Sequence, residues 1–187
     1  MADLANGRDA RPGELPFIAF ITKWQSSFWP FPDDMISFCT GTIITNQWIL
    51  TAAHCVRKQN VYYKVNVGLI DKSNKGRDYG YDKIIMHENY RKGNDKYDLA
   101  LIKLNDVLDF KQQHTDRLIN AICLPQPNDN IPYNEYALTT GFGLISDNVL
   151  DDKLKMGWTK IANKTNKFNQ KHLIIGQIFP RFGGSFY

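Results

Sequence analysis

The sequence predicts an all-β fold made of two successive β units. Short apolar runs separated by turn residues occur along most of the 187 residues, which include 13 glycines and 8 prolines. Apolar runs separated by such turn residues favour strands joined by turns over long helices. No helical stripe of comparable strength occurs in the first half of the chain. With 43% hydrophobic residues, the chain is able to bury a real core.

The first unit contains six predicted strands. The turn-forming segment Pro-Gly-Glu-Leu-Pro at 12–16 precedes the first of them. Asn46-Gln47, between two apolar runs, predicts a hairpin. Valine and tyrosine alternate with polar residues over 61–67, the period-two pattern of a half-buried strand. The predicted strands span 17–22, 37–45, 48–52, 61–67, 81–87 and 99–104.

The second unit has fewer strands than the first. A polar segment at 106–120 is expected to cross the surface and connect the two units. Beyond it, strands are predicted at 136–141, 154–161 and 173–179.

Charge and hydropathy argue against two classes of partner. The net charge of +4 is mild, and the one candidate basic patch has too few aromatics for a nucleic-acid platform. That patch consists of Lys153, Lys155, Lys160, Lys164, Lys167 and Lys171. Because the charge is mild and the aromatics are few, we expect no nucleic acid as a partner. No run of 18 apolar residues exists, so we also expect no membrane as a partner. Residues 1–7 lack the apolar core of a signal peptide, which we expect to have been removed or not included.

Cysteine usage and one sequon point to the secretory route. The three cysteines suggest one pair plus a thiol with an external partner. Asn163-Lys164-Thr165 is an N-glycosylation sequon, which acts only in a secretory setting. We therefore expect a secreted, extracellular protein.

Two motifs carry the chemistry. Thr-Ala-Ala-His-Cys at 51–55 contains His54, and 44 residues later Asp98 opens the run Asp-Leu-Ala-Leu-Ile-Lys-Leu. Together with Cys-Thr-Gly-Thr at 39–42 and the segment 4–17, these motifs resemble the trypsin/chymotrypsin family of serine proteases over residues 4–161. The resemblance implies a chymotrypsin-like double six-stranded Greek-key β-barrel whose second barrel is incomplete. It also implies one trypsin-like peptidase domain over 1–187, with a first barrel at 4–110 and a partial second barrel with an atypical tail at 121–187.

The resemblance makes His54 the general base and Asp98 its orienting partner. A serine hydroxyl is a poor nucleophile, so a neutral imidazole must take its proton, and a carboxylate fixes the imidazole tautomer. The alternatives are a structural histidine beside a disulfide and an aspartate that caps the strand at Leu99. The other histidines, His87, His114 and His172, lack this context and are interpreted as surface or packing residues.

The cysteines are also assigned by resemblance. Cys39 and Cys55 match the family's disulfide next to the catalytic histidine, the alternative being two buried thiols in a reducing cell. Cys123 resembles the cysteine that tethers a catalytic domain to an N-terminal light chain or propiece, the alternative being a free thiol.

The family's nucleophile segment, Gly-Asp-Ser-Gly-Gly-Pro, does not occur in this sequence. Its nearest imitation is Gly183-Gly184-Ser185, which keeps the glycine two residues before the serine but lacks the aspartate. Leu4 matches the residue freed by activation, but Asp3 precedes it instead of Arg or Lys. Residues 179–187 look foreign to the family, and an aberrant exon or shifted reading frame is our hypothesis for them.

The loop at 71–82 lies where some relatives bind calcium, but lysines and an arginine interrupt its carboxylates, so we expect no metal and no cofactor. Three functions remain: a trypsin-like serine endopeptidase completed by further sequence or by Ser185, an inactive secreted homologue that binds a protein or peptide, and a truncated product. The missing serine motif favours the last two for this chain.

Overall fold

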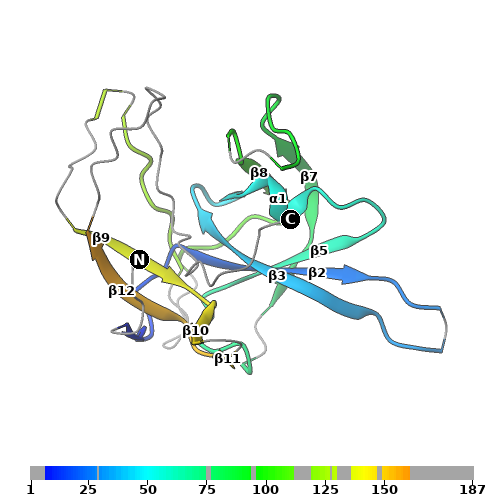
Figure 1. Cartoon of the computed structure of the whole chain (residues 1–187), viewed down its shortest axis with the longest axis horizontal. Helices are drawn as coiled ribbons and strands as arrows, with labels where there is room; N and C mark the ends of the chain where they lie inside the picture. Colours follow the sequence, from blue (N-terminus) through cyan, green and yellow to red (C-terminus); the bar gives the residue numbers. More distant parts are fainter. Residues whose placement is uncertain are drawn as a thin grey trace.

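The computed structural model of the chain describes residues 7–160 apart from 29, 75–76, 94–95, 112–118, 127, 130–135 and 147–148. The regular secondary structure of this part is all strand apart from one four-residue helix (Figure 1). The elements are β1 Arg8–Asp9, β2 Ile18–Gln25, β3 Asp34–Ile43, β4 Trp48–Thr51, α1 Ala53–Val56, β5 Tyr62–Val67, β6 Asp78–Tyr79, β7 Tyr81–Met86, β8 Ala100–Leu104, β9 Tyr136–Gly141, β10 Leu144–Ser146, β11 Val149–Leu150 and β12 Lys155–Lys160.

Seven strands form one antiparallel sheet in the order β6-β5-β2-β3-β4-β8-β7. The two ends of this order, β6 and β7, are separated in sequence by Gly80 alone. The sheet therefore curls round into a nearly closed barrel. Strands β2, β3 and β4 are consecutive neighbours and β5 returns to lie beside β2, which is a Greek-key arrangement.

Strand β2 is buried on both faces, which explains its continuous apolar run. Ala19 and Ile21 point into the barrel core together with Val65 and Ile102. The alternate residues Ile18 and Phe20 belong to a second core. Successive side chains of a strand point to opposite faces, so this one strand serves two cores.

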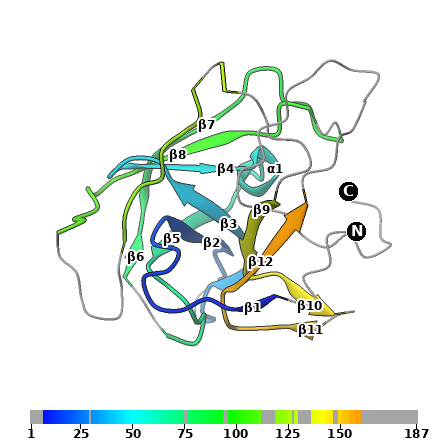
Figure 2. The ribbon, with the colours of Figure 1, turned by 90° about the vertical axis from the view of Figure 1, so that its left-hand side faces the viewer.

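The second core joins the barrel to a three-stranded sheet of order β1-β12-β9 (Figure 2). Phe142 is fully buried there, and its ring centroid lies 5.0 Å from that of Phe20. Leu154 and Met156 complete the contact from the β12 side. A short hairpin, β10–β11, lies beside this sheet. The all-β fold of two successive units expected from the sequence is thus observed, as a nearly closed barrel followed by a second sheet.

The predicted strands agree with the observed ones, with differences at their ends. The strand predicted at 136–141 has those bounds, and that at 154–161 spans Lys155–Lys160. Strands β2 and β3 extend further than predicted, to a Gln25–Asp34 pair, because they form a long hairpin with a register shift near Lys23. The strand predicted at 173–179 lies outside the described residues.

The connector predicted to cross the surface at 106–120 is wrong at Leu108. That side chain is 2% exposed and belongs to the barrel core. Its amide donates to the carbonyl of Asn46, which draws the backbone against the β3–β4 turn. The few apolar residues of this segment, such as Val107, Leu108 and Phe110, stand among charged and polar ones, and so sparse a pattern does not indicate which of them is buried.

Within the described residues, none of the helices has the length and apolarity that a membrane span requires.

Candidate active site

His54 lies on α1, a single helical turn that follows β4. The residue at the helix N-cap is Ala52, whose side chain carries no acceptor for the first amides. Asp98 supplies that acceptor from 44 residues away, because its Oδ1 accepts the backbone N–H of His54 at 2.8 Å. One carboxylate oxygen therefore fixes the backbone of the histidine.

The other oxygen of Asp98 fixes the imidazole ring. Oδ2 lies 2.6 Å from Nδ1 of His54, so the neutral ring places its proton on Nδ1 and donates it to the carboxylate. The lone pair of Nε2 is then available as an acceptor. The His54 side chain is 45% exposed and that of Asp98 26%, so the pair faces solvent on the histidine side.

The backbone before β8 turns Asp98 toward the helix. Tyr97 has a φ of 60°, an uncommon value for a bulky residue. The amide of Leu99 donates to the carbonyl of Tyr97 at 2.7 Å. Both oxygens of the Asp98 carboxylate bond to His54, one to its backbone amide and one to its ring. His87 stacks on Tyr97 with ring centroids 4.8 Å apart.

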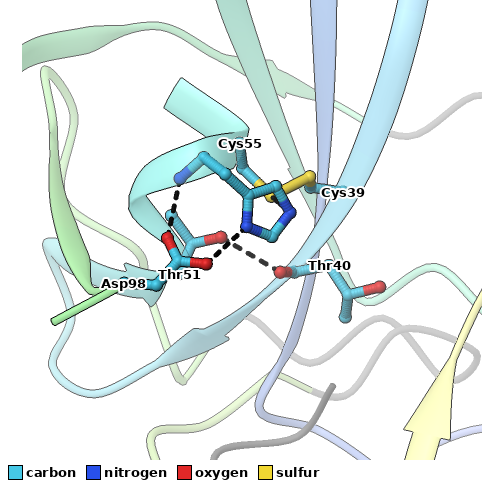
Figure 3. Close-up of a disulfide and its surroundings, with 6 residues drawn as sticks. Cys39, Thr40, Thr51, Cys55 and Asp98 are labelled. Atoms are coloured by element: carbon cyan, nitrogen blue, oxygen red, sulfur yellow. Dashed lines mark hydrogen bonds and ion pairs between the residues drawn. A yellow bond between two sulfur atoms is a disulfide. The ribbon is translucent and has the colours of Figure 1, made fainter. Parts of the chain in front are cut away.

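A disulfide between Cys39 and Cys55 ties β3 to α1, as Figure 3 shows. The two Cα atoms lie 6.1 Å apart. Beside it, the hydroxyl of Thr51 donates to the carbonyl of Thr40 at 3.1 Å, which links β4 to β3 inside the barrel. The helix that carries His54 is thus held by a covalent bond and by Asp98.

The candidate nucleophile Ser185 and the candidate glycosylation site Asn163 are outside the described residues. The same is true of His114, His172 and Leu4. In the described part of the chain, no serine hydroxyl hydrogen-bonds to His54. The neighbour of its Nε2 is Cys55 Sγ at 3.5 Å.

Cys123 is exposed and forms no disulfide within the described residues. Two lysines of the predicted basic patch are in ion pairs: Lys153 with Asp9 at 3.2 Å and Lys155 with both Asp9 and Asp151. These contacts hold β1 against β12 and raise the pKa of Lys155, chiefly through the hydrogen bond to Asp151.

Across the described ranges, one group of His, Cys, Asp and Glu donors is close enough to hold a metal ion. It consists of Cys39, His54 and Cys55, whose ligand atoms lie within 4.8 Å of one another. Both sulfurs are engaged in the disulfide.

Sequence reasoning missed the bond from Asp98 to the His54 amide. The signal was present in the alanine at position 52, because a helix that starts on alanine needs an acceptor from elsewhere. The helix itself is too short to produce a periodic pattern.

Comparison with known proteins gives the class and then the family. The fold resembles that of a solved structure of GrC, with a TM-score of 0.69 at 21% identity, covering 83% of this chain and 64% of that one. This likeness supports a chymotrypsin-like fold. Residues 4–178 match the Trypsin family. The chain belongs to the trypsin family.

Three curated relatives are similar over most of this chain. Bovine (Bos taurus) coagulation factor XI is 34% identical over 147 residues, covering 75% of this chain and 21% of the relative. Transmembrane protease serine 11C of Mus musculus is 33% identical over 167 residues, covering 87% and 35%. Phenoloxidase-activating factor 1 of Holotrichia diomphalia is 32% identical over 162 residues, covering 75% and 41%. The chain spans between about a fifth and two fifths of the length of these relatives.

Proposed function

We propose that residues 1–187 belong to one trypsin-like serine endopeptidase domain, in which His54 is the general base and Asp98 orients it. The observation that carries this proposal is the pair of hydrogen bonds from His54 to the two oxygens of Asp98. They hold the backbone and the ring of one histidine while Nε2 keeps a free lone pair. A general base of an acyl-transfer enzyme needs these properties.

The chemistry follows from this geometry. Nε2 would accept the proton of a serine hydroxyl as that oxygen attacks a peptide carbonyl, and would later return it to the leaving amine. Asp98 would stabilise the imidazolium that forms in between, because it already accepts the Nδ1–H at 2.6 Å. The substrates implied by the family are proteins or peptides.

The serine itself is the open part of the proposal. The 187 residues contain no Gly-Asp-Ser-Gly-Gly segment, and the nearest serine context is that of Ser185. We propose that this polypeptide alone does not form an acyl-enzyme, and that endopeptidase activity requires a nucleophile from additional sequence. An inactive homologue that binds a protein or peptide is the alternative that the missing motif favours.

Labelling with a fluorophosphonate probe tests this directly, since the probe reacts only with an activated serine. We expect no stoichiometric labelling of the 187-residue chain, under conditions in which an intact trypsin-family protease is labelled. Cooperative thermal unfolding of the unlabelled chain would support a folded homologue over a truncated product. Stoichiometric labelling that disappears in Ser185→Ala would overturn the proposal and make Ser185 the nucleophile.

We further propose an extracellular setting, with a glycan on Asn163 and a disulfide from Cys123 to an N-terminal propiece. Support comes from the exposed thiol of Cys123 and from the Cys39–Cys55 disulfide, which forms and persists in oxidising compartments. Secretion from eukaryotic cells should shift the mass by one glycan, and Asn163→Gln should remove the shift. Secreted protein that carries no glycan would contradict the Asn163 assignment.

A further inference from the structure

Three potential metal ligands, one of which is the proposed base, lie close together in the candidate active site. The ligand atoms of Cys39, His54 and Cys55 lie within 4.8 Å of one another. While the disulfide is intact, its sulfurs are bonded to each other and offer no thiolate, which is the form of cysteine that binds metals. We propose that reduction of this disulfide creates a three-ligand site for Zn²⁺ or a similar borderline-soft divalent cation, made by Cys39 Sγ, Cys55 Sγ and His54 Nε2.

The spacing of two of the donors already matches a zinc site. Nε2 of His54 lies 3.5 Å from Sγ of Cys55. In a tetrahedral site with Zn–S of about 2.3 Å and Zn–N of about 2.0–2.1 Å, the distance between a sulfur and a nitrogen ligand is about 3.6 Å. His54 and Cys55 therefore need little rearrangement to share one cation.

Asp98 prepares the histidine for this role. A histidine that binds zinc almost always donates its other ring N–H to a carboxylate or carbonyl, which fixes the tautomer and raises the basicity of the ligating nitrogen. Here the Nδ1–H of His54 is donated to Asp98 Oδ2 at 2.6 Å. Nε2, the nitrogen on the side of the sulfurs, is left as the donor.

Burial gives the site a closed and an open side. Cys55 is 2% exposed, Cys39 is half-buried, and the His54 side chain is 45% exposed. Three protein ligands with one side toward solvent leave a fourth position for water. Two thiolates and an imidazole favour Zn²⁺, Co²⁺ or Cd²⁺ over Mg²⁺ and Ca²⁺, which prefer oxygen ligands.

The reaction that opens the site is a two-electron reduction. A dithiol reductant gives two electrons and two protons to the Cys39–Cys55 bond and leaves as its own disulfide. The two new thiols then bind one divalent cation and release two protons, since thiolates are the ligands. A disulfide oxidant reverses the sequence: it takes up the two electrons and two protons and leaves as thiols, while the two thiolates re-form the Cys39–Cys55 bond and the cation is released.

The consequence for the site rests on the proposed function. A cation on Nε2 occupies the lone pair that would accept the serine proton, so the reduced and metal-loaded chain could not use His54 as a base. Binding of the cation does not itself depend on a nucleophile. The two proposals can therefore fail separately.

Cobalt spectroscopy tests the site without any activity measurement. The Cys123→Ser variant of the full chain, reduced with a phosphine that is then removed without oxygen, would be titrated with Co²⁺. We expect one equivalent to produce a thiolate-to-cobalt charge-transfer band and the intense visible bands of a tetrahedral site, both displaced by Zn²⁺. The unreduced variant should show neither band.

Two further variants assign the ligands. His54→Ala should abolish the tetrahedral spectrum, and Asp98→Asn should weaken cobalt binding about 10–100-fold, the usual cost of removing a partner of a ligating histidine. His87→Ala is the matched control, since this histidine stacks on Tyr97 and is not one of the three grouped donors, and it should leave the titration unchanged. Equal cobalt binding by His54→Ala and its parent would overturn the proposal, as would the absence of any tetrahedral spectrum.

Loss of the disulfide could unfold the chain, so the near-ultraviolet circular dichroism is followed in parallel. If the reduced chain loses this signal, Zn²⁺ should restore it in the Cys123→Ser parent but not in the corresponding His54→Ala variant. Failure of Zn²⁺ to restore it would contradict the proposal. Cobalt binding tests the metal site alone, and fluorophosphonate labelling tests the proposed function alone, so the result of the labelling does not change the conclusion about the metal site.

Discussion

Asp98 has two acceptor oxygens, and each holds a different part of His54. Oδ1 accepts the backbone amide at 2.8 Å and Oδ2 accepts the ring N–H. Asp98→Asn keeps a carbonyl oxygen for the amide, whereas Asp98→Ala removes both acceptors and leaves the helix without a cap. We expect Asp98→Ala to lower the free energy of unfolding by about 1 kcal/mol more than Asp98→Asn does. Urea denaturation of the two variants measures this, and equal losses would contradict the capping role.

Gly41 lies where β3 passes close to the side chains of the barrel core. A Cβ at this position would come within 2.7 Å of Ile49 Cγ2 and 2.8 Å of Ile21 Cδ1. We expect Gly41→Ala to destabilise the protein by about 1–3 kcal/mol, the usual cost of overpacking. Gly141→Ala is the matched control, because the Cβ there would meet only Thr40 Oγ1 at an ordinary 3.6 Å. Equal denaturation midpoints for the two variants would show that the core has room at Gly41.

At the scale of elements, the short strand β1 is held in place by ion pairs. It has two residues, and one of them, Arg8, forms an ion pair with Glu14. The hydrogen bond from Arg8 lowers the pKa of Glu14 from 4.5 to about 2. Because the folded-state pKa is depressed, the stability that this carboxylate contributes is present above pH 4.5 and is lost as the pH falls toward 2.

Glu14→Gln should therefore be less stable than the parent chain at neutral pH, and the difference should shrink as the pH falls below 4.5. The pair is exposed to solvent, so added salt should reduce the difference as well. Denaturation series across this pH range, at low and high salt, check both effects. A difference that is independent of pH would contradict the assignment.

Periodicity and turn residues predicted the longer strands because each combined several apolar residues with clear boundaries. The strand β9 was predicted at its observed bounds. The two-residue strand β1 exists through pairing with a distant partner, as Arg8 pairs with Met156, and local sequence cannot carry that information. Strands β6 and β11 pair with nearer strands but are too short to show a period. The pairing of His54 with Asp98 was expected from resemblance to a family. The second bond, to the backbone amide, required the three-dimensional structure.

At the scale of the whole molecule, β2 couples the barrel to the second sheet. Its alternate side chains enter two different cores, so the two parts should not unfold independently. Phe142 tests this coupling because it is fully buried between the sheets. Phe142→Ala should cost about 3–5 kcal/mol, and Phe142→Leu should cost less.

Both variants should still unfold in one transition, with the same midpoint in near- and far-ultraviolet circular dichroism. A second transition that appears in Phe142→Ala, with the barrel signal unchanged, would show that the two parts are independent units. The single-domain proposal for residues 1–187 would then be wrong.

The central claim is that Asp98 fixes the tautomer of the neutral His54 ring, with the proton on Nδ1 and a free lone pair on Nε2. Long-range ¹H–¹⁵N NMR of the folded chain, above the pH at which this ring protonates, identifies the tautomer directly. We predict a proton on Nδ1 in the parent chain and on Nε2 in Asp98→Asn, whose amide would donate to Nδ1 instead. A proton on Nε2 in the parent chain, or the same tautomer in both proteins, would contradict the account.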